Sequence, residues 1–179
     1  IDQNKLNVEK KSLKVILCIG SGGHTTELLK IVAKMNLTKY SPRLYMMADS
    51  DNNCEAKINS TEKDTKKCTS AIYVLYCVPP ILRFRPDVRI CNGPGTCIPI
   101  CFVVFFMRCS YILDCRIVFI ESLCRVRTLS LSGKILQFIA DIFVVQWPQL
   151  HRVSWRIKMI LLSADPVRGW LMADPSLNT

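Results

Sequence analysis

The sequence has few acidic residues and no apolar run long enough to span a membrane. It contains 14 Asp and Glu residues against 24 Lys and Arg, for a formal charge of +10. The longest strongly apolar stretch, residues 97–107 ("CIPICFVVFFM"), has 11 residues, whereas a membrane-spanning helix needs about 20. Internal repeats and low-complexity segments are absent as well. Half of the 179 residues are hydrophobic, so we expect one folded domain with a real core.

The deficit of acidic residues extends along the whole chain. Residues 1–89 carry 15 basic and 9 acidic residues, and residues 90–179 carry 9 and 5. A basic chain suits an anionic partner such as nucleic acid, phospholipid headgroups or a diphosphate substrate. Alternatively, the charge only keeps the protein soluble.

Paired cysteine motifs typical of zinc sites are also missing. The ten cysteines include no CxxC, and the one close pair, Cys97 and Cys101, has no histidine nearby in the sequence. We therefore expect no bound metal. Five cysteines lie in apolar runs, which favours buried free thiols and a reducing compartment such as the cytosol: Cys18, Cys77, Cys91, Cys101 and Cys124.

Apolar runs of strand length recur along the chain. Residues 13–19 ("LKVILCI") form a continuous apolar run, typical of a strand buried on both faces of a parallel sheet. Further strands are predicted at residues 44–48, 88–91, 116–120 and 142–145.

Helical segments separate these strands. A helix capped by Thr25 or Thr26 is predicted after the first strand, and Pro79-Pro80 should kink or break another. The helices after it are predicted at residues 97–107 and 129–140, whereas residues 52–70 read as a surface loop or short exposed helix. The alternation favours an α/β fold with a Rossmann-like, doubly wound parallel sheet.

Three loops are expected to share the carboxyl edge of this sheet, where ligands bind in open α/β folds. They are residues 20–25 ("GSGGHT"), 93–96 ("GPGT") and 121–127 ("ESLCRVR"). Glycines let the backbone approach a ligand, and the N–H groups at the start of a following helix favour an anion. The sequence therefore predicts one anion-binding crevice.

The first loop leaves several ligands open. It lacks the GxxxxGK[ST] pattern of a P-loop. As a dinucleotide fingerprint it has Gly20 and Gly22, with Asp49 as a ribose-binding acid, but Thr25 stands where a third glycine is expected. A tight turn without any ligand is a further alternative.

Two side chains at these loops have both structural and chemical interpretations. His24 caps the helix start or faces solvent, or else it donates to a phosphate oxygen or takes a proton from a hydroxyl. Glu121 ends a buried strand, where a carboxylate is costly unless it is paired or catalytic. Arg125 and Arg127 are close enough in sequence to pair with it.

Together, "GSGGHTTELL", "RPDVRICNGPGTCIPIC", "ESLCRV" with "LSLSGKIL", and "DIFVVQWP" resemble one family. It is the membrane-anchoring subunit of the two-subunit UDP-N-acetylglucosamine transferase of asparagine-linked glycosylation. The resemblance covers residues 13–150 and extends to the N-terminal half of bacterial GT-B glycosyltransferases that act on lipid-linked precursors. It implies that this chain is one half of a GT-B glycosyltransferase.

The resemblance implies a non-catalytic subunit that is not active alone. The subunit recruits a catalytic subunit to the cytosolic face of the endoplasmic reticulum membrane and binds the lipid acceptor. The complex then transfers the second GlcNAc from UDP-GlcNAc to dolichol-diphosphate-GlcNAc. Nucleic acid and cofactors are not expected as ligands.

The resemblance also implies site residues. The acceptor diphosphate would lie against two glycine loops, and His24 and Glu121 are the candidate catalytic residues. The diphosphate-binding residues would be Gly22, Gly23, His24, Thr25, Gly93, Gly95 and Thr96.

The chain departs from the family pattern at several places. We expect residues 1–12 to be a juxtamembrane segment without the anchor itself and 13–150 the Rossmann-like acceptor-binding domain. Residues 151–179 are expected to be a divergent tail, with a last strand and helix or disorder as the alternatives. A stretch near residues 66–72 looks deleted, and Arg127 replaces a commonly acidic residue. Two alternative functions stay open: an NAD(P)-dependent Rossmann oxidoreductase and an inactive truncated variant.

Overall fold

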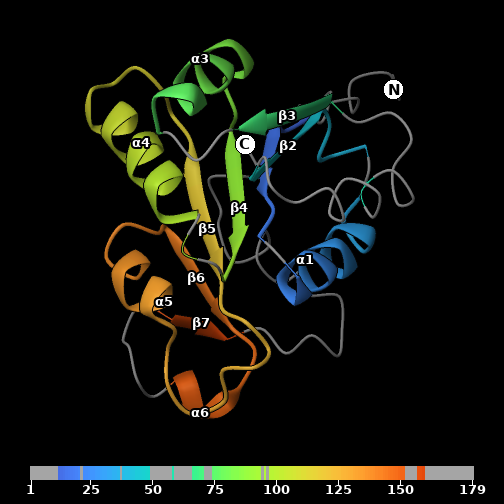
Figure 1. Ribbon diagram of the computed structural model, residues 1–179, viewed down its shortest axis with the longest axis vertical. Coiled ribbons are helices and arrows are strands. Elements are labelled where there is room, and N and C mark those ends of the chain that lie inside the picture. Colours follow the sequence, from blue (N-terminus) through green and yellow to red (C-terminus); the bar gives the residue numbers. More distant parts are fainter. Residues whose placement is uncertain are drawn as a thin grey trace, which may run out of the picture.

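The computed structural model contains a single sheet of seven parallel strands. It describes residues 12–20, 22–36, 38–48, 58, 66–70, 74–93, 95, 97–151 and 157–159. The strand order is β3-β2-β1-β4-β5-β6-β7, with β4 at the centre and β1 beside it (Figure 1). The strands are β1 (Val15–Cys18), β2 (Arg43–Ala48), β3 (Lys66–Ser70), β4 (Val88–Asn92), β5 (Arg116–Ile120), β6 (Ile142–Val145) and β7 (Ile157–Met159). The predicted parallel α/β fold is confirmed.

Helices cover both faces of the sheet. In Figure 1, α1 lies on one side, and α3, α4 and α5 lie on the other. The helices are α1 (Gly23–Ala33), α3 (Val74–Phe84), α4 (Cys97–Cys109), α5 (Leu131–Leu136) and α6 (Pro148–His151). Each of the strands β1, β4 and β5 is followed by a helix. A helix is the usual connection between parallel strands.

The apolar run of β1 is explained by a core on each face. Ile16 and Cys18 pack with the helices α3 and α4 in one cluster, whereas Val15 and Leu17 pack with α1 in the other. Alternate side chains of a strand point to opposite faces, so a central strand must be apolar at every position. This is the pattern that predicted a doubly buried strand.

Several predicted elements differ from the observed ones. β5 and β6 match their predicted bounds, but residues 66–70, predicted as loop or exposed helix, form β3 and pair in parallel with β2. The helix predicted at 129–140 is α5, which spans only Leu131–Leu136. Pro79 and Pro80, which were predicted to kink or break a helix, both lie inside the single helix α3.

The tail contributes to the sheet. β7 pairs in parallel with β6, with Phe143 opposite Ile157 and Val145 opposite Met159. The sequence shows no helical or alternating hydrophobic pattern at this strand, because only three residues form it. Pairing to a strand already in place is enough to order so short a segment.

The buried cysteines surround a buried arginine. Cys18, Cys77, Cys91 and Cys101 are buried free thiols as predicted, but Cys124 is exposed, because it lies in the loop after β5. Arg89 on β4 is fully buried and donates to Sγ of Cys18 from Nε and Nη2, at 3.2 and 3.0 Å. Burial raises the pKa of Cys18 to about 12. Thiol sulfur thus replaces water around part of this guanidinium.

Candidate functional site

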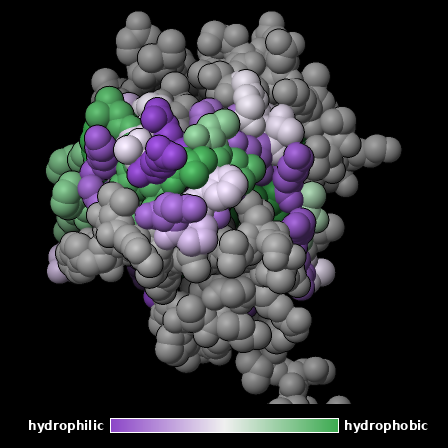
Figure 2. Space-filling view, turned by 90° about the horizontal axis from the view of Figure 1, so that it is seen from below, coloured by the Kyte–Doolittle hydropathy of each residue, from purple (hydrophilic) through white to green (hydrophobic). Residues whose placement is uncertain are grey.

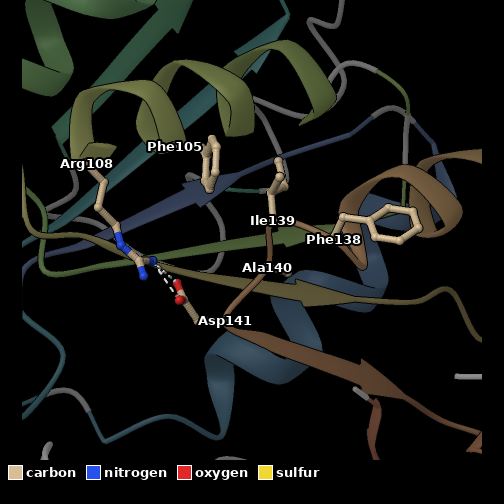
Figure 3. A pocket seen from close by; sticks show the side chains of 6 residues that line it. All are labelled: Phe105, Arg108, Phe138, Ile139, Ala140 and Asp141. Carbon is tan, nitrogen blue, oxygen red and sulfur yellow. Dashed lines mark hydrogen bonds and ion pairs between the residues drawn. The ribbon is translucent and has the colours of Figure 1, made fainter. Parts of the chain in front are cut away.

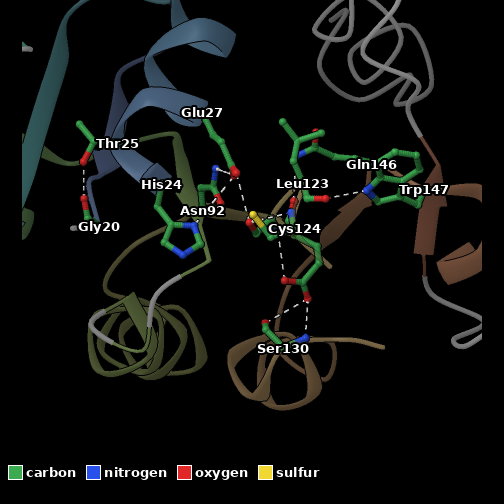
Figure 4. Close-up of polar contacts among 12 residues, drawn as sticks. Gly20, His24, Thr25, Glu27, Asn92, Leu123, Cys124, Ser130, Gln146 and Trp147 are labelled. Atoms are coloured by element: carbon green, nitrogen blue, oxygen red, sulfur yellow. Dashed lines mark hydrogen bonds and ion pairs between the residues drawn. The ribbon is translucent and has the colours of Figure 1, made fainter. Parts of the chain in front are cut away.

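The first, second and third loops meet at the carboxyl edge of the sheet. β1 and β4 end in register, with Cys18 opposite Cys91, and Asn92 of β4 lies opposite Ile120 of β5. Contacts between side chains then join the residues that follow these strands (Figure 4). The convergence expected from the sequence is therefore present.

The first loop turns at Gly22. This residue has φ 67° and ψ −125°, and α1 begins at the next residue with no side chain capping it. The expected cap at Thr25 or Thr26 is thus wrong, since both residues lie inside the helix. Thr25 is fully buried, and its hydroxyl donates to the carbonyl oxygen of Gly20. That bond ties the start of α1 back onto the end of β1.

Both glycine loops leave their backbone open. A Cβ added at Gly22, Gly23 or Gly95 would meet no heavy atom within 4 Å. Gly95 also lies two residues before α4, and the first N–H groups of a helix have no partner within it. The start of α1 therefore faces this edge with an open backbone, the arrangement that favours a bound anion. At the start of α4, the N–H of Ile98 already donates to the carbonyl oxygen of Gly95 and Pro99 has no N–H, so the backbone at Gly95 is the open part of the second loop.

His24 packs against the second loop. A Cβ on Gly93 would lie 2.4 Å from Nδ1 of His24 and 2.5 Å from Cε1, so only glycine fits beside the ring. Gly93 also has a φ of 70°, which other residues adopt only with strain. Nδ1 is inaccessible and accepts or donates no hydrogen bond within the described residues. The side chain as a whole is 33% exposed.

Glu27 is a residue that the sequence analysis missed. Its Oε2 accepts a hydrogen bond from Nδ2 of Asn92 at 3.1 Å, and its Oε1 accepts one from Oγ of Ser122 at 3.2 Å. Oε2 also lies 3.9 Å from Nδ1 of His24. The carboxylate therefore joins α1 to the ends of β4 and β5. The available signal was its position three residues after His24, which places both on one helix face.

Glu121 is held differently from the prediction. No ion pair joins it to Arg125 or Arg127, and both arginines are exposed. Its carboxylate is fully buried and accepts hydrogen bonds from the backbone N–H of Ser122, at 3.1 Å, and from N and Oγ of Ser130, at 3.0 Å each. Because hydrogen bonds and the nearby start of α5 stabilise this carboxylate, it needs no arginine as an ion-pair partner.

Gly133 explains one part of the "LSLSGKIL" motif. A Cβ at this position would lie 2.2 Å from Oε2 of Glu121, so the glycine makes room for the carboxylate. Ser130 in turn caps α5 by accepting a hydrogen bond from N–H of Gly133 at 2.9 Å. The motif therefore builds the support of the third loop.

The "DIFVVQWP" motif secures the third loop from the other side. Nε2 of Gln146 donates to the carbonyl oxygen of Glu121 at 2.9 Å, and Nε1 of Trp147 donates to that of Leu123 at 2.7 Å (Figure 4). Side chains after β6 thus fix the backbone after β5.

The carboxyl edge of the sheet also carries exposed apolar side chains. Leu123, Val126 and Leu131 are 40, 38 and 74% exposed, and exposed Arg125 and Arg127 alternate with them along the loop. Figure 2 views this end, with hydrophobic residues among hydrophilic ones. Apolar and cationic groups therefore occupy one rim.

Two predicted residues cannot be placed. Thr96, assigned to the diphosphate, and Asp49, assigned to a ribose, lie outside the described residues. Within the described part of the chain, no group of three or more His, Cys, Asp or Glu side chains is arranged to hold a metal ion. No helix of that part is long and apolar enough to cross a membrane.

A separate pocket lies at the opposite end of the sheet. It has a volume of about 360 Å³ between α4 and α5 and is lined by Phe105, Arg108, Phe138, Ile139, Ala140 and Asp141 (Figure 3). Asp141 immediately precedes β6, so it marks the amino edge of the sheet. Nη1 of Arg108 donates to both of its carboxylate oxygens at 2.6 Å. This ion pair closes one wall, far from the three loops.

The fold is similar to that of a bacterial glycosyltransferase. A crystal structure of MurG from Acinetobacter baumannii, a GT-B enzyme, superposes with a TM-score of 0.64 at 9% sequence identity. The match covers 83% of this chain and 45% of that chain. The chain thus spans less than half of MurG and has the fold of one part of it.

Sequence comparison identifies closer relatives, each called UDP-N-acetylglucosamine transferase subunit ALG14. The mouse protein is 37% identical over 171 residues and the human protein 39% over 170, each alignment covering 79% of this chain and 78% of the relative. The Yarrowia lipolytica protein is 35% identical over 161 residues, covering 76 and 74%.

The family profile described as "Oligosaccharide biosynthesis protein Alg14 like" matches residues 15–76 and 65–160. The two matches meet where the sequence analysis placed a missing stretch, and the second includes β7. With the parallel sheet, the glycine loops and the relatives in agreement, the chain belongs to the Alg14 family of oligosaccharide biosynthesis proteins.

Proposed function

We propose that the chain is the acceptor-binding subunit of a two-subunit UDP-GlcNAc transferase and is inactive without its catalytic partner. It binds dolichol-diphosphate-GlcNAc and recruits the catalytic subunit, which holds UDP-GlcNAc, to the cytosolic face of the endoplasmic reticulum membrane. The complex then transfers the second GlcNAc. The relatives' name, transferase subunit, supports the need for a partner, as does the match to less than half of MurG.

The meeting of two open glycine loops at one edge carries this proposal. The N-terminus of α1 and the open backbone at Gly22, Gly23 and Gly95 would supply N–H donors for a diphosphate. His24, packed on Gly93, borders the same space. Thr25 would act through the turn that it holds, because its side chain is buried.

The third loop suits a lipid-linked acceptor. Leu123 and Val126 offer apolar contacts for an isoprenoid chain or the membrane, and Arg125 and Arg127 offer positive charge to phosphate groups. Glu121 supports this loop from inside, where its carboxylate has no exposed surface. We therefore place it behind the acceptor rather than at the reacting atoms.

The dinucleotide alternative has lost its support. Thr25 occupies the position of the third glycine, which in a dinucleotide fingerprint lets the helix pack closely on the strand, and its hydroxyl is bonded to the carbonyl oxygen of Gly20. Membership of the Alg14 family favours the glycosyltransferase assignment.

Co-purification followed by a transfer assay tests the proposal. The chain is co-expressed with the catalytic subunit of a relative, and the purified complex receives UDP-GlcNAc and a lipid-diphosphate-GlcNAc acceptor. We expect transfer by the complex and none by either chain alone. A complex that forms but binds no acceptor, or a failure to form any complex, would overturn it and favour an inactive variant.

A matched truncation addresses the tail. The same experiment without residues 151–179 removes β7 and its pairing with β6. Loss of the partner from the truncated chain would assign part of the interface to this end of the sheet. Retained binding would place the interface on the first 150 residues.

A further inference from the structure

We propose that Glu27 is a positioning residue that keeps the hydrogen of the neutral His24 ring on Nδ1, which leaves Nε2 to accept a proton from the acceptor hydroxyl. The proposal rests on the proposed function for its chemistry, but the position of the hydrogen can be measured without it. It chooses between the two chemical roles that the sequence left open for His24.

The geometry around Nδ1 carries the first step. Oε2 of Glu27 lies 3.9 Å from Nδ1, one helical turn away. Nδ1 is inaccessible, and within the described residues it has no hydrogen-bond partner. A lone pair on Nδ1 would therefore lie near a carboxylate oxygen without compensation, whereas an N–H there brings partial positive charge near that negative charge. Which ring nitrogen carries the hydrogen is set by such a neighbour.

The carboxylate of Glu27 is held independently of His24. Asn92 donates to Oε2 and Ser122 donates to Oε1, so one oxygen is fixed by a residue of β4 and the other by a residue of the loop after β5. The side chain of Glu27 is only 15% exposed, which limits competition from water. A carboxylate anchored in this way can orient an imidazole without moving itself.

The remainder of the His24 ring faces outward. Its side chain is 33% exposed although Nδ1 is not, so the exposed surface belongs to the other atoms. In Figure 4 the ring points away from α1, toward the side on which α4 and α5 lie. Nε2 with a free lone pair can then receive a proton from a hydroxyl, but it cannot donate to a phosphate oxygen.

The transfer step balances with this assignment. The acceptor hydroxyl oxygen forms a bond to C1 of the GlcNAc residue, the bond from C1 to the UDP oxygen breaks, and UDP leaves with that electron pair. The hydroxyl proton moves to Nε2 of His24. Glu27 then faces a ring that carries a positive charge, which its carboxylate stabilises.

Long-range 1H–15N spectra of the histidine rings test the tautomer directly. The chain has only two histidines, His24 and His151, so a His151→Gln variant assigns both signals. At pH values where the ring is neutral, we expect the Nδ1–H form for His24 and a shift toward the Nε2–H form in Glu27→Gln. Ser122→Ala keeps the carboxylate and should retain the Nδ1–H form. An Nε2–H ring in the unmodified chain, or the same pattern in Glu27→Gln, would refute the proposal.

A double-mutant cycle in the complex tests the consequence. Glu27→Gln should lower kcat about 10- to 100-fold with little change in the acceptor KM or in the Tm. In a His24→Ala background the same substitution should have no further effect, because the two residues act as one unit. An equal loss of kcat in both backgrounds would show a structural role for Glu27 and refute the proposal. An inactive unmodified complex would count against the proposed function alone, since the spectra still decide the role of Glu27.

Discussion

Two carboxylates at the same edge of the sheet have opposite environments. Glu121 is fully buried, and its carboxylate accepts hydrogen bonds from the backbone of Ser122 and from Ser130, the residue that caps α5. Glu27 is 15% exposed and joins α1 to β4 and to the loop after β5, beside a histidine that is 33% exposed. Glu121, a candidate catalytic residue in the sequence analysis, thus supports a loop. Glu27, which the sequence analysis missed, borders the candidate site.

The largest expected effect is on stability, at Glu121. Glu121→Ala leaves the N–H groups of Ser122 and Ser130 without their acceptor and opens a cavity, so we expect a loss of about 3 kcal/mol in the free energy of unfolding. Glu27→Ala, the matched control, should cost about 1 kcal/mol, because Glu27 is itself partly exposed and water can enter the space that its carboxylate leaves. Chemical denaturation followed by circular dichroism measures both. Equal losses would abolish the contrast.

A substitution at Gly93 should be next in size. Gly93→Ala adds a Cβ at 2.4 Å from His24 in a backbone with φ 70°, so we expect a cost of about 2 kcal/mol and a displaced ring. Gly95→Ala, with open space around it, is the control and should leave the unfolding free energy nearly unchanged. If both variants unfold alike, the contact between the first two loops is not tight.

The smallest effect is expected at Trp147. Trp147→Phe keeps an aromatic ring but removes the hydrogen bond to the carbonyl oxygen of Leu123. At a residue 36% exposed, we expect a loss of no more than about 1 kcal/mol. Hydrogen exchange of residues 121–127 should nevertheless increase. Unchanged exchange would mean that Glu121 and Gln146 hold the third loop without help from Trp147.

The sequence predicted the sheet well where strands are central. β5 and β6 were placed at their observed bounds, because a strand buried on both faces is apolar throughout and stands out. β3 was missed because "KKCTS" is polar, and its pairing with β2 alone makes it a strand. The same holds for β7, whose three residues pair only with β6.

The candidate site was predicted in part for a similar reason. The glycine loops, His24 and their shared edge followed from motifs and strand ends. Glu27 was missed because its partners, Asn92 and Ser122, are 65 and 95 residues away in sequence. The suspected partners of Glu121, Arg125 and Arg127, were near in sequence but point elsewhere, since Ser130 already bonds its carboxylate.

The sequence by itself determined the parallel α/β fold, the three loops and the family to which the motifs point, because periodicity and short motifs are local. Only the tertiary structure decided which carboxylate meets His24, and that Arg89, in a strand that reads as apolar, lies fully buried against Cys18. Burial and pairing are properties of residues brought together from distant parts of the chain. A buried charge is tolerated only where such neighbours stabilise it.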